Sequence, residues 1–273
     1  MRYLLLLFTA LFFFMSCRSS NLIRPGDTLD VAFDKAMNQF ENENWRDAAE
    51  AFETVVSIGR GTDVGQDAQF FLAESYFNNR QFLLSATEYE RYAVFHPRSP
   101  RREQAEFKEA RSYYNMSPRF RLDQTNTRRA LDKLRLFTSR YPASDFIPEA
   151  GEMITELRAK LAEKNYHAAE FYMRTGRYRA AAVYFSLILD QFPESVWAEQ
   201  AIADQVEAYK LYADNSIPQR QLERYERARD SYETYIQLFP RGENRERVEA
   251  LYNDISREIE QRRQAESRAS ADS

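Results

Sequence analysis

Residues 178–193 read YRAAAVYFSLILDQFP, an amphipathic helical pattern that stops at a proline. Proline ends a helix because it has no backbone N–H to donate and its ring clashes with the preceding turn. Three other segments stop in the same way, at Pro97, Pro142 and Pro240. Counting back from the four prolines gives a small residue at twelve and large apolar residues at eight and five. These are Ser85, Ala130, Ala181 and Ala228, then Tyr89, Leu134, Phe185 and Tyr232, then Tyr92, Phe137, Ile188 and Tyr235.

A fifth copy of the pattern lies near the start of the chain and lacks the proline. It consists of Trp45, Ala48, Phe52 and Val55, followed by a turn at residues 59–61. Small residues where two helices cross, with large residues a turn later, are what stacked antiparallel helix pairs need. Five second helices are therefore predicted. First helices that would precede them are visible at residues 36–40, 73–76 and 169–172.

The repeated pattern resembles the tetratricopeptide repeat, in which each unit is one helical hairpin. Successive prolines lie 45, 51 and 47 residues apart, against about 34 for that repeat. Insertions at residues 115–127 and 214–222 account for much of the excess. We expect an all-α fold, an α-solenoid of about five tetratricopeptide-like hairpins. A plain helical bundle is the alternative, but a register repeated at fixed offsets favours a stack.

The N-terminus is typical of a bacterial lipoprotein signal. Arg2 is followed by an apolar run at residues 3–15, and Ser16 precedes Cys17, the single cysteine of the chain. We expect cleavage before Cys17, lipidation (palmitate among the acyl chains) and attachment to a membrane surface. The alternatives are an uncleaved transmembrane helix or an ordinary secretory signal. Thirteen apolar residues span only about 20 Å against a hydrocarbon core of about 30 Å, so a stable span is disfavoured.

Composition agrees with helices joined by short turns, because the chain has only 7 Gly. A lone cysteine also excludes an internal disulfide. The predicted organisation is a signal peptide, a lipidated tether, N-terminal repeats, C-terminal repeats and a disordered tail rich in Gln, Glu, Ser and Arg. These segments cover residues 1–16, 17–28, 29–142, 143–261 and 262–273, respectively.

Catalytic chemistry finds little support in the sequence. The chain has two histidines, His96 and His167, and its one cysteine is assigned to lipidation. Neither a zinc site nor a Cys-His nucleophile can be assembled from these residues, and we expect both histidines to pack or cap helices. There is no Gly-rich phosphate loop, and acidic residues are too numerous to single out a pair. We therefore expect no enzymatic activity, no cofactor and no metal.

Charge is distributed unevenly along the chain. Residues 98–140 hold 12 basic and 5 acidic residues, whereas residues 30–97 hold 5 basic and 12 acidic ones. The basic residues of 98–140 form either a solvated helix face in an arginine-rich chain or a surface that docks a partner or lipid headgroups. Nucleic acid is excluded as a partner by the net negative charge and the export signal. The docking candidates are Arg98, Arg101, Arg102, Arg128 and Arg129.

Three segments resemble the BamD family, the outer-membrane lipoproteins of the β-barrel assembly (BAM) machinery. They read NWRDA at residues 44–48, ALDKLRLFTSRYPAS at 130–144 and LAEKNYHAAEFYMRTGRY at 161–178, where a long helix bridges the middle and later repeats. The resemblance extends roughly over residues 29–252. Departures are the linker at residues 214–222, the basic middle and a highly charged last repeat.

This resemblance implies a non-catalytic scaffold, lipid-anchored at the periplasmic face of the outer membrane, that assists folding and insertion of β-barrel proteins. Arg18 after the lipidated cysteine, where an inner-membrane retention signal would have Asp, also points to the outer membrane. N-terminal repeats would offer a groove to unfolded barrel proteins, with candidates Phe40, Trp45, Tyr76 and Phe77. C-terminal repeats would dock periplasmic domains of the barrel-forming core subunit. Alternatives are a tetratricopeptide scaffold of envelope division or trafficking, a glycan-binding partner of a nutrient porin and, least supported, an enzyme.

Overall fold

The computed structural model describes residues 22–271, and within them the chain forms eleven helices and no strand. The all-α expectation is confirmed for this part of the chain. Two compact units meet between Asn115 and Met116, and we call them unit 1 and unit 2. None of the helices in the described range is long and apolar enough to cross a bilayer.

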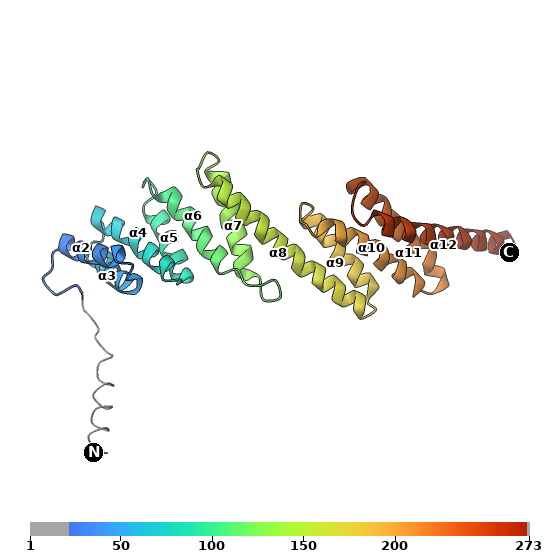
Figure 1. The fold of residues 1–273 in the computed structure, drawn as a ribbon, viewed down its shortest axis with the longest axis horizontal. Coiled ribbons are helices and arrows are strands. Elements are labelled where there is room, and N and C mark those ends of the chain that lie inside the picture. The colour runs from blue at the N-terminus through green and yellow to red at the C-terminus, as the bar shows by residue number, and fades with distance from the viewer. Residues whose placement is uncertain (1–21, 272–273) are drawn as a thin grey trace, which may run out of the picture. The chain divides into compact units, whose positions relative to one another are not determined.

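Unit 1 consists of two helical hairpins and one further helix, and consecutive helices pack side by side (Figure 1). Its helices are α2 (Leu29–Glu41), α3 (Trp45–Ile58), α4 (Asp63–Asn78), α5 (Phe82–Phe95) and α6 (Arg102–Asn115). Unit 2 contains α7 (Thr125–Arg140), α8 (Ile147–Arg174), α9 (Tyr178–Gln191), α10 (Ala198–Asp214), α11 (Pro218–Leu238) and α12 (Arg245–Ala271). The five predicted second helices are α3, α5, α7, α9 and α11.

The repeat register derived from the prolines is confirmed. Helices α5, α7, α9 and α11 each end two residues before their proline. All four small residues of the pattern are 0% exposed, and the large residues five before the proline are at most 1% exposed. One large residue at the position eight before the proline, Tyr232, is only half-buried, and it stacks on Tyr252 of α12 with ring centroids 4.1 Å apart. Close helix crossings therefore lie where the sequence placed them.

Three hairpin turns share one backbone motif that ends their first helix. Glu43, Arg80 and Gly176 have φ of 59°, 59° and 70°, respectively, and each N–H bonds to the carbonyl three residues back. The next N–H in each turn bonds five residues back, as from Asn44 to Gln39 at 2.9 Å. This pair of bonds is the Schellman motif, which satisfies the last carbonyls of a helix and reverses the chain.

The division between units comes earlier than the expected one after Pro142. The loop before α7 is fixed to α8, because Lys160 Nζ donates to Ser117 Oγ at 3.0 Å. Lys164 Nζ donates to the Phe120 carbonyl at 3.2 Å. These contacts join α7 and its preceding loop to α8, so both belong to unit 2.

The expected disorder at residues 262–273 also differs from the structure, since α12 continues to Ala271. Arg262 Nε donates to Gln221 Oε1 at 3.1 Å, and its guanidinium lies 4.7 Å from the Tyr225 ring centroid. Polar residues in this segment contact α11, and low hydrophobicity in the sequence does not reveal such contacts.

Enlarging the buried alanines tests the helix crossings. We expect Ala181→Leu and Ala228→Leu each to cost about 1–3 kcal/mol in unfolding free energy, because a closed crossing has no space for three more carbons. Ala250→Leu, at an exposed position inside α12, is the matched control and should leave the melting temperature nearly unchanged. Equal melting temperatures for the parent and all three variants would contradict the register.

Candidate functional site

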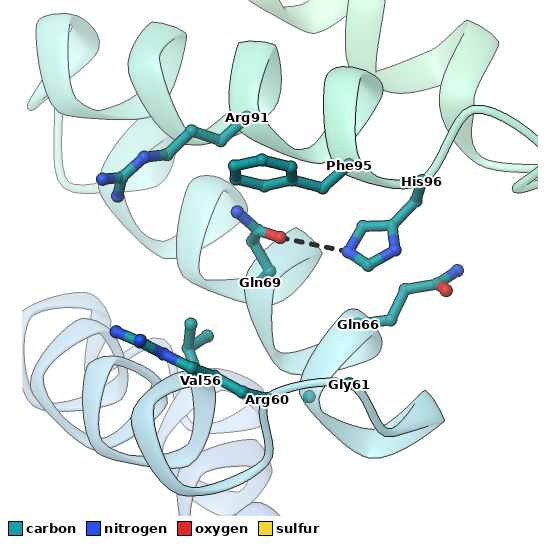
Figure 2. A pocket seen from close by; sticks show the side chains of 9 residues that line it. Val56, Arg60, Gly61, Gln66, Gln69, Arg91, Phe95 and His96 are labelled. Carbon is teal, nitrogen blue, oxygen red and sulfur yellow. Dashed lines mark hydrogen bonds between the residues drawn. The ribbon is translucent and has the colours of Figure 1, made fainter.

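Unit 1 contains a crevice of about 530 Å³ between α3 and α5, with α4 beneath them. Figure 2 shows Arg91 and Phe95 on one wall, Val56 and Arg60 on the other, and Gln69 between them. The residues come from two successive hairpins. Its shape therefore depends on how the hairpins stack, not on one helix alone.

Glycines bring the α3–α4 turn close to the start of α4. A Cβ on Gly65 would lie 2.0 Å from the Gly59 carbonyl oxygen, a distance that no side chain tolerates. Gly61 has φ +80°, a left-handed conformation that favours glycine. Thr62 caps α4 by accepting the Gly65 N–H at 3.0 Å. This tight turn places Arg60 at the edge of the crevice.

Polar side chains at the base of the crevice are held by hydrogen bonds. Gln69 is 7% exposed, and its Oε1 lies 3.2 Å from His96 Nε2. Gln66 Nε2 donates to the Tyr92 hydroxyl at 3.3 Å. Partial burial lowers the pKa of His96, so the imidazole is neutral at pH 7. The base of the crevice is thus polar but uncharged.

Positive charge and an apolar ring surround this base. Arg60 is exposed, and the structure gives it no salt bridge within residues 22–271. Arg91 bonds to Glu88 at 2.9 Å, with more than half of its own side chain exposed. Phe95 is 67% exposed, which is unusual for a phenyl ring beside a cavity. The arrangement suits an anionic group attached to an apolar one, as in a peptide.

The aromatic residues predicted for a groove lie mainly in packing positions. Phe40 meets Trp45 edge to face, with centroids 5.1 Å apart, inside a cluster of phenyl rings. Tyr76 is 8% exposed and donates its hydroxyl to Glu53. Burial and this hydrogen bond raise the pKa of Tyr76. Phe77 packs on Phe82 and under Arg111. A binding role for these four residues stays a prediction.

The predicted basic surface is divided between the units. Arg101 Nη1 bonds to Asp67 Oδ1 at 2.8 Å, and Arg102 Nε to Glu106 Oε1 at 2.9 Å, so both are engaged within unit 1. Arg98 is exposed at the turn after α5. In unit 2, Arg128 is exposed and Arg129 has an interaction partner. These five arginines do not share one environment.

Two remaining predictions concern Cys17 and His167. Cys17 lies outside the described residues. His167 Nδ1 lies 2.6 Å from Glu170 Oε2, and its ring stacks on Phe120 at 4.7 Å. In the described range, no group of three or more His, Cys, Asp or Glu side chains could hold a metal ion.

Sequence reasoning missed Arg60, Gln69, Arg91 and Phe95 as a group. Each looks like an ordinary helix-surface residue in its own segment, and only the stacking of α5 on α3 and α4 gathers them. Phe95 stands directly before His96-Pro97, where the pattern of other repeats explains the position as a helix stop. The high exposure of Phe95 would have marked it as a candidate site residue, but exposure cannot be read from the sequence.

Comparison with known proteins places this architecture in a family. A family model described as outer membrane lipoprotein, YfiO, matches residues 26–223, from the segment before α2 to the second turn of α11. The chain belongs to the YfiO family. The resemblance derived from the three sequence segments is therefore confirmed.

Relatives of this YfiO-family chain include proteins named outer membrane protein assembly factor BamD. The Caulobacter vibrioides protein is 20% identical over 203 residues, which cover 74% of this chain and 67% of the relative. The Vibrio cholerae protein is 22% identical over 211 residues, covering 74% and 88%, respectively. The Xylella fastidiosa (strain 9a5c) protein is 30% identical over 101 residues, 35% of each chain.

Among solved structures, a tetratricopeptide repeat protein of Bacteroides fragilis is similar to this chain. It is 11% identical, and the alignment covers 85% of this chain and 99% of that one, with a TM-score of 0.43.

Proposed function

We propose that the protein is a scaffold lipoprotein of the outer-membrane β-barrel assembly machinery and assists folding and insertion of barrel proteins. The observation that carries this proposal is the YfiO-family match over residues 26–223, together with relatives named as assembly factors. The scaffold is non-catalytic in this proposal. Among the described residues, His96 is hydrogen-bonded to Gln69 and His167 to Glu170, and the base of the unit 1 crevice is uncharged. None of these groups is an activated nucleophile.

The protein is anchored in the outer membrane by acyl chains on Cys17 and faces the periplasm. Family membership supports the outer-membrane association, and the signal-like residues before Cys17 support the anchor. The short segment between Cys17 and α2 would leave the folded units accessible to soluble domains of other envelope proteins.

The crevice of unit 1 is the place where an unfolded barrel chain binds. Arg60 and Arg91 attract carboxylates, while Phe95 and Val56 contact an apolar side chain next to them. Stacked hairpins commonly bind extended segments in this way, with pockets for individual side chains. The barrel-forming core subunit docks through its periplasmic domains on the C-terminal repeats of unit 2.

Affinity purification of the lipidated protein from detergent-solubilised membranes tests this function. We expect the barrel-forming core subunit and unfolded barrel chains to co-purify. Recovery of a nutrient porin, or of division or trafficking proteins without the core subunit, would instead support one of the alternative functions.

The crevice is tested in the same purification with Arg60→Gln/Arg91→Gln. This variant should keep the core subunit and lose most of the barrel chains, because only the unit 1 crevice is altered. The variant should keep its fold, since exposed ion pairs contribute little to stability. Equal recovery of barrel chains by the parent and the variant would show that these chains bind elsewhere and not in this crevice.

A further inference from the structure

Unit 2 has a crevice that corresponds to the one in unit 1, between α7 and α9 with α8 beneath, of about 410 Å³. Its buried residues are apolar: Leu131 is 4% exposed and Phe192 is 7% exposed. Most of its exposed residues are charged, and the two exposed cations, Arg128 and Arg135, come from α7. The crevice therefore combines an apolar base with a positive border.

A third arginine of the crevice is already neutralised. Arg158 of α8 bonds through Nε and Nη2 to the carboxylate of Glu194, and Nη2 also donates to the Gln191 carbonyl at 2.6 Å. Its guanidinium lies 5.2 Å from the Phe192 ring centroid. The hydrogen bond from Arg158 lowers the pKa of Glu194. Arg158 is thus part of the wall, and its charge is not available to a ligand.

Arg128 and Arg135 are in a different situation. Seven residues separate them on α7, so they share a face about 10 Å apart along the helix. The described residues give neither of them a salt bridge, although Arg128 acts through space on Asp123 and Arg135 on Glu194. Asp132 lies on the same face, one turn from each arginine. Two cations with no bonded anion therefore border the crevice, with a carboxylate between them.

Of the two crevices described in unit 2, only this one has a positive border. The next crevice of unit 2, between α9 and α11, has a similar volume of about 550 Å³. Its border carries Asp190 and Asp230, and its Arg227 is bonded to Glu223 at 2.8 Å. A general preference of the chain for arginine would make both crevices positive. Their opposite charge indicates that the α7–α9 crevice is adapted to an anionic ligand.

We propose that the α7–α9 crevice binds an acidic segment of a partner protein, in which two carboxylates about 10 Å apart flank apolar side chains. Such a segment pairs its carboxylates with Arg128 and Arg135 and rests its apolar side chains on Leu131 and Phe192. The carboxylate of Asp132 repels a ligand with continuous negative charge, which disfavours the phosphate layer of a bilayer. This site is separate from the unit 1 crevice and does not depend on the function proposed above.

Binding of two synthetic peptides to the purified full chain tests this proposal. The first has a Glu-Ser-Leu-Ser-Glu core with Ser and Gly flanks, because residues four apart in an extended chain share one face. Their Cα atoms are about 13 Å apart, and the flexible Glu and Arg side chains bridge the difference. The second has Gln in place of both Glu. Fluorescence anisotropy should show about tenfold tighter binding of the acidic peptide at low salt, a difference that shrinks as salt screens the exposed charges.

The variant Arg128→Gln/Arg135→Gln should abolish the preference for the acidic peptide with circular dichroism unchanged. Arg179→Gln/Arg241→Gln is the matched control, because it removes the same charge at two other exposed positions of unit 2. An acidic peptide that binds no better than its Gln counterpart, or a preference that the first double variant keeps, would overturn the proposal. So would vesicles of phosphatidylglycerol that bind through the same arginines while the peptide does not.

Discussion

Replacing Cys17 by alanine is expected to remove the mature protein from the membrane fraction or to leave an uncleaved precursor. Each acyl methylene buried in a bilayer contributes about 0.8 kcal/mol, so one chain holds a protein marginally and two or three chains hold it durably. No described helix can replace this anchor by spanning the membrane. Detergent-phase partitioning and labelling with radioactive palmitate measure the change.

A second variant separates loss of the anchor from failure of export. The signal of a soluble secreted protein replaces residues 1–16 in the Cys17→Ala chain, which should then appear folded and soluble in the periplasm. Ser19→Ala keeps the cysteine and should partition as the parent does. Detergent partitioning that Cys17→Ala leaves unchanged, with no palmitate label in the parent, would contradict lipid anchoring.

The helical stack was predictable because its signals are local. Pro97 and its three counterparts end helices by a backbone effect that operates in any context. The small residues twelve positions earlier reflect a packing constraint that each hairpin meets in the same way, and Ala181 and its counterparts are fully buried. Repetition of both signals at one register gave four of the five second helices, and the packing pattern alone gave the fifth.

The turns and crevices were less predictable. Glu43 and Arg80 adopt a left-handed conformation that residues other than glycine rarely adopt. Gly176 therefore indicates its turn in the sequence, whereas Glu43 and Arg80 do not. Arg135 and Arg158 are ordinary charged residues in their own helices. They lie in one crevice only because α7, α8 and α9 stack. A site built between hairpins depends on contacts that no single segment encodes.

The attachment of the long insertion before α7 could not be predicted from the sequence. Its polar composition is typical of a free loop, yet Lys160 and Lys164 fix it to α8. Lysines on a long helix are usually solvated, and their bonds to Ser117 and to backbone carbonyls follow from the tertiary structure.

Gly65→Ala is expected to produce the largest loss of stability among single substitutions of small residues in unit 1. The new Cβ would lie 2.0 Å from the Gly59 oxygen and 2.6 Å from its carbonyl carbon. That carbonyl cannot easily move, because it accepts the Thr62 N–H at 3.1 Å and the Thr62 hydroxyl at 2.6 Å. We expect a cost of about 3 kcal/mol, at the upper end for overpacking, because backbone must move.

Gly151→Ala provides the matched control, since both glycines lie inside helices and the new methyl group at position 151 meets nothing within 4 Å. Alanine there should stabilise α8 by about 0.5–1 kcal/mol, because glycine loses more backbone entropy in a helix. The two substitutions thus add the same methyl group and should shift the melting temperature in opposite directions. Hydrogen exchange should locate the loss for Gly65→Ala in α3 and α4, beside the unit 1 crevice. If both variants instead became more stable, the close approach of Gly65 to Gly59, and with it the position of Arg60 at the crevice, would be wrong.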